Sequence, residues 1–285
     1  MLSDYPNNFE SRAILILLAF SNLYVPSNSN IDSTKMHDLS ASKTTKRTEE
    51  DEGRGVQWVE AILWQPRAAI YHNLLSKQEC EHLINLAKPH MQKSVVVDGK
   101  SGMGKESSVR TSSSSSLPRG RDEIIQNIEE RSAKFTFIPV EKGEAFQVLH
   151  YDVGQKYDLH CDYFTDGFNP RNGGNRMATL LMYLSDVEKG GETVFPAARG
   201  NFLAKCGNQG LSVKPKMGDA LLFWNMKPEG FANMSTPRLH SFLSYILGMF
   251  VQSFYLSCPG SCPVIKGNKW VATKWMPVNE YKLDS

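Results

Sequence analysis

The stretch Phe146–Phe164 reads FQVLHYDVGQKYDLHCDYF, and its pattern predicts the fold class. An apolar run of strand length ends at a cluster of Asp, Gly, Gln and Lys, and similar short runs follow it along the chain. Many short strands separated by Gly, Pro, Asn and Asp are typical of a β-sandwich or jelly roll. We therefore expect a mainly β domain with a jelly-roll core. Its further strands are predicted at residues 177–184, 193–195, 210–213, 220–224 and 270–275.

Two flanking α-helices are predicted before these strands. Ser76 and Glu79 have the spacing of a capping box, and apolar residues then recur at helical spacing up to Pro89. A second apolar stripe predicts a helix over 121–135. Between them, residues 98–118 are rich in Gly and Ser and include a run of consecutive serines, which predicts a mobile surface loop.

The N-terminal part, residues 1–57, has a different composition. Its apolar run, residues 13–25, is shorter than the roughly 20 residues of a membrane-spanning helix. This favours a signal peptide or a short signal anchor, and the alternative is an apolar patch in a leader. The polar residues 26–55 predict a disordered stem. We expect residues 58–285 to form the folded domain.

Composition narrows the class of function. The chain has 285 residues with 41% hydrophobic residues and a formal charge of +2, which predicts a globular protein without bulk attraction to nucleic acid. The five cysteines include no CxxC pair, so a structural zinc site is not expected. An odd number also leaves at least one thiol without a partner in the chain.

A metal-binding pattern follows the first predicted strand. His160 and Asp162 stand at i and i+2, so in an extended chain their side chains lie on one face. Two histidines and one carboxylate form the facial arrangement of non-haem iron oxygenases. His240 is the one histidine that follows His160 in the chain. Taken alone the pair is weak, because most such pairs are polar surface residues.

Four segments together identify a family. They read FTFIPVEKGEAFQVLHYDVGQKYDLHCDYF, MATLLMYLSDVEKGGETVFP, GLSVKPKMGDALLFW and CPVIKGNKWVATKW. The chain resembles the plant prolyl 4-hydroxylases, which are iron(II) and 2-oxoglutarate dependent dioxygenases, from about Trp58 to its C-terminus. The resemblance implies a double-stranded β-helix fold. It also implies hydroxylation of peptidyl proline, coupled to conversion of 2-oxoglutarate to succinate and CO2, with L-ascorbate as a further cofactor.

Site residues are carried over from the same resemblance. His160, Asp162 and His240 match the iron ligands, and Lys269 matches the lysine that binds the distal carboxylate of 2-oxoglutarate. A buried carboxylate needs such a cation. Alternation along the strand places Lys269 and Lys274 on opposite faces, so only one can point into the barrel. The other matches are Tyr151, Thr193 and Trp275 for the cosubstrate, and Arg176 and Tyr157 for the peptide.

Residues 241–259 depart from the family pattern. They form an apolar insertion directly after His240. This indicates a retained intron or a spurious exon boundary. If the segment is translated, we expect an exposed hydrophobic loop that disturbs His240. The alternative function is therefore a catalytically impaired or mis-spliced paralogue that acts at most as a binding protein. A shortened segment between Phe202 and Cys206 is a second departure. Cys161, which stands between two of the expected ligands, is a third departure and is prone to oxidation.

Location and partners follow from the family and the N-terminus. We expect a lumenal catalytic domain in the endoplasmic reticulum or Golgi, as a type II membrane protein, with proline-rich secreted peptides as substrates. The resemblance pairs Cys206 with Cys262 in a disulfide. Asn233 begins a glycosylation sequon, a weak signal because short sequons arise by chance.

Overall fold

The structure is a computed structural model that describes residues 54–64, 67–97, 103–164, 172–195, 206, 211–226 and 258–282. The compact unit that contains them is Gly53–Ser285. The predicted signal segment, most of the stem, His240 and the sequon at Asn233 lie outside the described residues. Among the helices that are described, none has the length and apolar character needed to cross a membrane.

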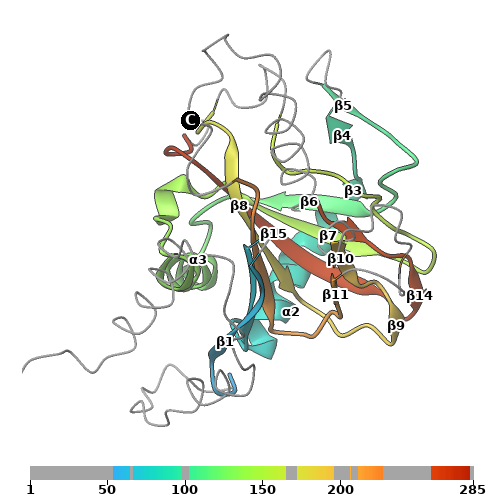
Figure 1. Ribbon diagram of the computed structural model, residues 1–285, viewed down its shortest axis with the longest axis horizontal. Coiled ribbons are helices and arrows are strands. Elements are labelled where there is room, and N and C mark those ends of the chain that lie inside the picture. The colour runs from blue at the N-terminus through green and yellow to red at the C-terminus, as the bar shows by residue number, and fades with distance from the viewer. Residues whose placement is uncertain are drawn as a thin grey trace, which may run out of the picture. The chain divides into compact units, whose positions relative to one another are not determined.

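An antiparallel sheet of eight strands forms the centre of this unit (Figure 1). Its order is β1-β2-β12-β8-β15-β7-β6-β3. The strands predicted at residues 146–151, 193–195 and 220–224 have those bounds, and the bounds of the others shift by one or two residues. The members are β1 (Trp58–Trp64), β2 (Arg67–His72), β3 (Gln92–Lys93), β6 (Ser113–Leu117), β7 (Phe146–Tyr151), β8 (Arg176–Tyr183), β12 (Ala220–Trp224) and β15 (Lys269–Pro277).

Smaller sheets accompany the central one. The order in the three-stranded sheet is β11-β10-β13, and β14 pairs with β9 and β4 with β5. Antiparallel strands in a large and a small sheet make the jelly-roll core that the sequence predicts. The bounds are β4 (Val96–Val97), β5 (Gly104–Lys105), β9 (Lys189–Gly190), β10 (Thr193–Phe195), β11 (Leu211–Val213), β13 (Gly260–Ser261) and β14 (Val264–Lys266).

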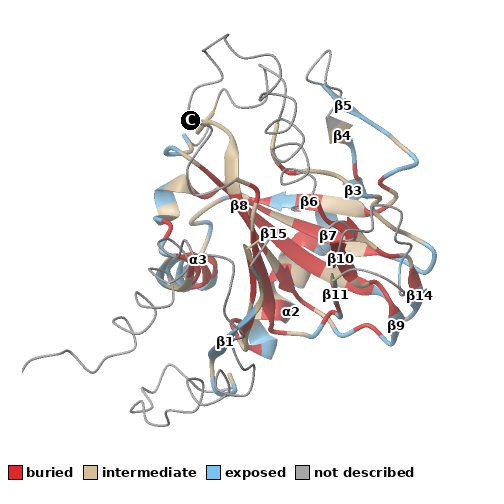
Figure 2. Cartoon of the chain, in the orientation of Figure 1, coloured by how far each residue is buried: buried red, intermediate tan, exposed pale blue. Residues whose placement is uncertain are grey.

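The two faces of the large sheet bury different cores. Leu180 and Met182 of β8 belong to a core shared with the helices, whereas Tyr183 belongs to a core shared with the small sheets. The side-chain period of two along a strand produces this division. Figure 2 shows the buried residues concentrated along the central strands. The sheet therefore has a helix face and a face toward the small sheets.

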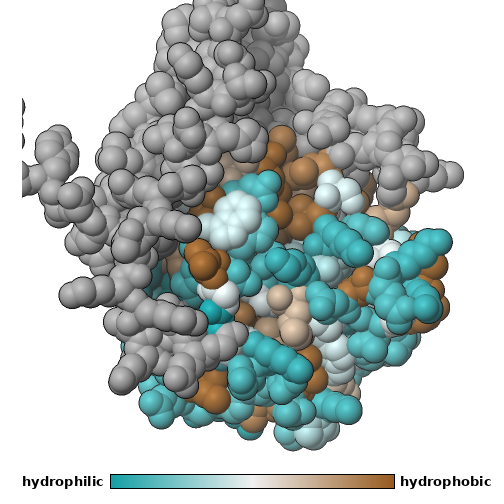
Figure 3. All heavy atoms as spheres, turned by 90° about the horizontal axis from the view of Figure 1, so that it is seen from below, coloured by the Kyte–Doolittle hydropathy of each residue, from teal (hydrophilic) through white to brown (hydrophobic). Residues whose placement is uncertain are grey.

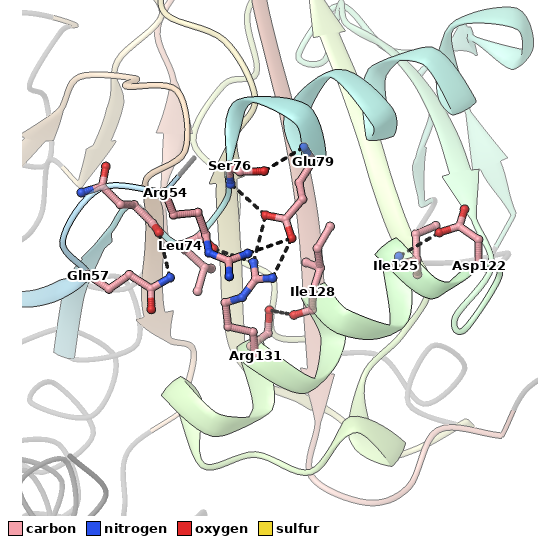
Figure 4. Close-up of polar contacts among 11 residues, drawn as sticks. Arg54, Gln57, Leu74, Ser76, Glu79, Asp122, Ile125, Ile128 and Arg131 are labelled. Carbon is pink, nitrogen blue, oxygen red and sulfur yellow. Dashed lines mark hydrogen bonds and ion pairs between the residues drawn. The ribbon is translucent and has the colours of Figure 1, made fainter. Parts of the chain in front are cut away.

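Two α-helices cover the helix face. They are α2 (Lys77–Ala87) and α3 (Glu123–Thr136), accompanied by the short 3-10 helices η3 (Lys88–His90) and η4 (Val140–Lys142). The predicted capping box is present, because Ser76 Oγ accepts from the Glu79 amide while Glu79 accepts from the Ser76 amide. Arg131 of α3 donates two bonds to the Glu79 carboxylate, at 2.6 and 3.0 Å (Figure 4). The N-terminus of α2 is thus tied to α3 by a charge-assisted fork.

The serine-rich segment departs from its prediction as a loop. Residues 98–102 are outside the described part, but β6 lies between β7 and β3 in the sheet, and Ser112 and Leu117 are fully buried. Ser112 Oγ donates to Ser94 Oγ at 2.9 Å. Serine has little intrinsic preference for strands, so pairing with β7 decides the conformation. The loop prediction was wrong for this part of the segment.

Hydrophilic side chains are interspersed with hydrophobic ones over the face of the molecule shown in Figure 3. Scattered apolar residues of this kind are normal on a protein surface.

Candidate active site

One cavity lies on the side of the sheet that faces the small sheets. Its walls come from β7, β8 and β15 of the large sheet and from β10 and β13 of the small one. Seven of the nine site residues expected from the sequence line it: Tyr151, Tyr157, His160, Asp162, Thr193, Lys269 and Trp275. Positions spread over more than a hundred residues of sequence thus meet at one place.

His160 and Asp162 converge at this cavity. The distance from His160 Nε2 to Asp162 Oδ1 is 3.7 Å. His160 Nδ1 lies 2.9 Å from the carbonyl oxygen of Asp158. A carbonyl can only accept a hydrogen bond, so Nδ1 carries the proton and Nε2 of the neutral ring keeps its lone pair. Burial lowers the pKa of His160, which favours the neutral ring.

Asp162 is held by a relay that the sequence did not reveal. Thr179 Oγ1 donates to Asp162 Oδ2 at 2.7 Å, and Asn225 Nδ2 donates to Thr179 Oγ1 at 2.9 Å. Asp162 Oδ2 therefore accepts the hydrogen bond from Thr179, and Oδ1, on the side of His160, remains available to a metal ion. A carboxylate that binds a metal usually has such a hydrogen bond from a residue that does not itself touch the metal. Thr179 lies on β8, where strand alternation predicts its face but not its partner.

A metal ion fits this pair. An imidazole lone pair and a carboxylate oxygen, each fixed by a partner on its other atom, are the donors that non-haem iron takes. Among the described residues there is no cluster of three or more His, Cys, Asp or Glu side chains that could hold a metal. His240, the third ligand expected from the sequence, lies outside these residues.

Lys269 supplies a buried cation to the same cavity. The residue is 1% exposed, and its ammonium donates to Ser261 Oγ at 2.8 Å. Burial lowers the pKa of Lys269 to about 7, while the charge of Glu192 acts in the opposite direction. Among the described residues, no carboxylate lies within ion-pair distance of this ammonium. An anionic ligand would therefore relieve a desolvated charge.

The two expected hydroxyl donors stand beside this lysine. The Lys269 ammonium lies 5.2 Å from the centre of the Tyr151 ring, and burial raises the pKa of Tyr151. Thr193 Oγ1 accepts from the hydroxyl of Tyr183 at 2.9 Å. Since Tyr183 uses its own proton for this bond, the Thr193 proton remains available to a ligand. Tyr183 was missed because buried strand tyrosines are common.

The two expected peptide-binding residues differ in their relation to the cavity. The Tyr157 ring stacks on His160 with centroids 3.5 Å apart. Arg176 does not line the cavity. It makes a bidentate ion pair with Glu144 at 2.7 and 2.8 Å, and its guanidinium lies 3.7 Å over the Trp275 ring. The structure thus connects Arg176 to the cavity through Trp275.

Arg110 is a cavity residue that the sequence analysis missed. It lies in the serine-rich segment that was predicted as a loop, is 7% exposed, and has its guanidinium 4.7 Å over the Tyr157 ring. Its Nη atoms donate to the carbonyl of Val95 and to Gln147 Oε1. The flanking glycines and serines hid it, because they indicated an exposed segment.

Four of the five cysteines form disulfides. Cys206 pairs with Cys262, as the resemblance implied, and Cys161 pairs with Cys258. Cys80 is a free buried thiol, in line with the odd count. Residues 258 and 259, predicted as the end of an exposed loop, instead pack beside the cavity, and the rest of 241–259 lies outside the described residues.

Comparison with known proteins first defines the class. The family model described as the 2OG-Fe(II) oxygenase superfamily matches residues 146–277. The crystal structure of a viral collagen prolyl hydroxylase from Paramecium Bursaria Chlorella virus-1, in a 2OG complex, is similar with a TM-score of 0.50 and 24% identity. It covers 73% of this chain and 94% of that chain, and it supports the jelly-roll fold.

Two relatives from Arabidopsis thaliana then define the family. A probable prolyl 4-hydroxylase 10 is 56% identical over 280 residues, covering 95% of this chain and 89% of the relative. Prolyl 4-hydroxylase 5 is 54% identical over 266 residues, covering 90% and 84%. The chain belongs to the plant prolyl 4-hydroxylase family. It is a 2-oxoglutarate dependent prolyl hydroxylase with iron(II), 2-oxoglutarate and ascorbate as cofactors, and the alternative of a mere binding protein is not favoured.

Proposed function

We propose that this chain hydroxylates C4 of proline in peptides, with iron(II) held by His160, Asp162 and His240. The observation that carries the proposal is a buried lysine without a carboxylate partner among the described residues, in the same cavity as a fixed His–Asp pair. A keto acid with two carboxylates carries a negative charge for the metal site at one end of the cavity and another for Lys269 at the other end. One end would chelate the metal, and the other would meet Lys269.

Each residue has a defined task in this proposal. Lys269 neutralises the distal carboxylate, and the hydroxyls of Tyr151 and Thr193 donate hydrogen bonds to it. Trp275 lines the cavity, and its buried Nε1 has no hydrogen-bond partner in the described structure, so it can donate to a ligand. When bound, iron(II) supplies the oxygen chemistry that couples decarboxylation of the keto acid to hydroxylation.

The peptide is proposed to enter on the side of Tyr157 and Arg176. The Tyr157 ring lies face to face with His160, and a proline ring would pack beside this pair. Arg176 holds Trp275 from behind through a cation–π contact and is itself fixed by Glu144. The target carbon would thereby be oriented toward the metal-binding pair while bulk water is kept out.

The proposed location is the lumen of the secretory pathway, with proline-rich secreted proteins as substrates. Two disulfides support it, because disulfides persist in oxidising compartments. The proposal of residues 1–57 as a signal or anchor segment with a stem, and of residues 58–285 as the catalytic domain, stands on composition. Fractionation of tagged protein with and without residues 1–57 tests both.

A turnover assay tests the catalytic proposal. Purified protein is incubated with iron(II), 2-oxoglutarate, ascorbate and a proline-rich peptide. Succinate release and the gain of one oxygen atom by the peptide are both measured. Asp162→Ala should abolish both signals, since it removes a metal ligand, whereas Asp152→Ala on the exposed turn after β7 should not. Undiminished turnover in Asp162→Ala would reject the assignment.

A further inference from the structure

We propose that the Cys161–Cys258 disulfide is a redox-operated clasp that holds one wall of the cavity in place and thereby controls binding of 2-oxoglutarate. Cys161 lies between the two proposed metal ligands, and Cys258 lies two residues before β13. The bond joins positions 97 residues apart in sequence. It connects the segment that carries His160 to the segment that carries Ser261.

These two segments run beside each other as a narrow ribbon. Tyr157 and Ser261 exchange both backbone hydrogen bonds, at 3.1 and 2.8 Å. Further along, the His160 amide donates to the Pro259 carbonyl at 3.0 Å. Any side chain at Gly260 would meet the Leu159 side chain at 3.1 Å, so the contact is close. The disulfide covalently closes the ribbon just beyond its last hydrogen bond.

The ribbon is part of the cavity wall. Pro259, Gly260 and Ser261 line the cavity together with Tyr157 and His160. Ser261 Oγ accepts the hydrogen bond from the Lys269 ammonium, and the Ser261 backbone pairs with Thr193. A shift of this wall would therefore move the groups proposed to hold the distal carboxylate. It would also loosen the backbone that orients His160.

The two cysteines differ in exposure. Cys161 is half-buried, whereas Cys258 is 7% exposed, so we expect a reductant to reach the bond from the Cys161 side. Closing the clasp removes one proton and one electron from each thiol. A disulfide oxidant such as oxidised glutathione accepts the two electrons and two protons and leaves as two thiols. Opening it by a dithiol is the reverse exchange.

Peptide mapping and hydrogen exchange form the first test. Protein made in an oxidising compartment is alkylated before and after reduction, and we expect Cys161 linked to Cys258 with Cys80 free. In the double variant Cys161→Ser with Cys258→Ser, amide exchange should increase in peptides covering residues 157–161 and 259–264. The control Cys80→Ala should leave both peptides unchanged. A different pairing, or unchanged exchange in the double variant, would overturn the clasp.

The second test measures affinity and needs no turnover. Binding of 2-oxoglutarate is followed by calorimetry with Mn²⁺ in place of iron(II), in glutathione buffers of graded redox poise. We expect affinity in the wild-type protein to fall about tenfold as the 161–258 bond opens, and to be low and redox-independent in the double variant. The unmutated chain keeps this arm informative even where the variant folds poorly.

The other disulfide provides the matched control. The variant Cys206→Ser with Cys262→Ser should keep its redox response, because its 161–258 bond remains. Loss of the response in that variant, with retention in the first, would overturn the proposal. The affinity readout rests on the proposed function. A chain that binds no 2-oxoglutarate in any redox state refutes that function, while hydrogen exchange still decides the clasp.

Discussion

Two buried lysines on β15 differ in their partners. Lys269 is 1% exposed and Lys274 is 3% exposed, yet they point to opposite faces of the large sheet. Lys274 forms an ion pair with Glu129 of α3, and its ammonium lies 4.5 Å from the centre of the Phe146 ring. Lys269 contacts the Ser261 hydroxyl at the cavity.

The difference separates a structural charge from a functional one. A buried charge is stable in a protein when a counter-charge and hydrogen bonds compensate its lost hydration. On the helix face Glu129 supplies the counter-charge, and it also accepts from the Gly120 amide. On the cavity face the described residues leave this role to a ligand. Lys274 thus has its counter-charge within the described part of the chain, whereas Lys269 would obtain one from a ligand.

Removing Glu129 should give the largest effect. Glu129→Ala leaves the Lys274 ammonium buried without its carboxylate, and we expect a loss of about 3–5 kcal/mol in the free energy of unfolding. Urea unfolding followed by circular dichroism measures it. The paired variant Glu129→Leu with Lys274→Met should lose much less, because no orphaned charge remains. Equal losses in both variants would show that packing, and not charge pairing, holds α3 on the sheet.

Removing the cavity lysine should affect the ligand more than the fold. Lys269→Ala is expected to raise the 2-oxoglutarate concentration needed for half-maximal turnover by about a hundredfold, or about 2.7 kcal/mol, since the distal carboxylate loses its cation. Lys266→Ala is the neighbouring control and should leave this requirement unchanged. The Lys266 side chain is 71% exposed and pairs with Glu188.

The paired variant on the helix face completes this comparison. Glu129→Leu with Lys274→Met should leave the 2-oxoglutarate requirement unchanged, because that pair lies on the face away from the cavity. Lys274→Ala alone is a poor control, since it would orphan Glu129. A raised requirement in the paired variant, with none in Lys269→Ala, would exchange the roles of the two lysines.

Strand periodicity explains why this contrast could be predicted. Lys269 and Lys274 are an odd number of positions apart, so a period of two places them on opposite faces whatever the rest of the fold. Short apolar runs between turn residues located β7 and β12. The period of two brought His160 and Asp162 together, although the structure shows no strand at those two residues. Their convergence comes from a bend held by backbone bonds to neighbouring segments.

Partners distant in sequence could not be predicted in this way. Thr179 of β8 and Asn225, which directly follows β12, support Asp162, and nothing in their local sequence distinguishes them from other buried polar residues. The Cys161–Cys258 bond joins a residue without a recognised partner to one inside the supposed insertion. The serines of β6 became a strand through pairing alone. These features depend on tertiary context that overrides local preference.

The smallest effect concerns the protonation of the cavity lysine. Burial lowers the pKa of Lys269 from 10.5 to about 7, so the empty site loses this charge as the pH rises above 7. Affinity for 2-oxoglutarate should then fall by up to about tenfold per pH unit above 7 and be flat below it, because the bound form requires the ammonium. Binding at pH 8 should also take up a proton.

Calorimetry at pH 8, in buffers of different ionisation enthalpy, measures this proton uptake. The wild-type protein should take up close to one proton for each 2-oxoglutarate bound, and Lys269→Met should take up none. The unliganded protein gives an independent check. Between pH 7 and 10.5 the unfolded chain holds a proton that the folded chain has released, so the free energy of unfolding should rise with pH across that window. Burial also lowers the pKa of Lys274, so that lysine contributes to the rise as well. Lys269→Met should remove the part of the rise that belongs to the cavity lysine, whereas the Glu129→Leu with Lys274→Met variant should keep that part. If the Glu129→Leu with Lys274→Met variant lost the rise and Lys269→Met kept it, the lysine with the strongly lowered pKa would be Lys274 and not Lys269.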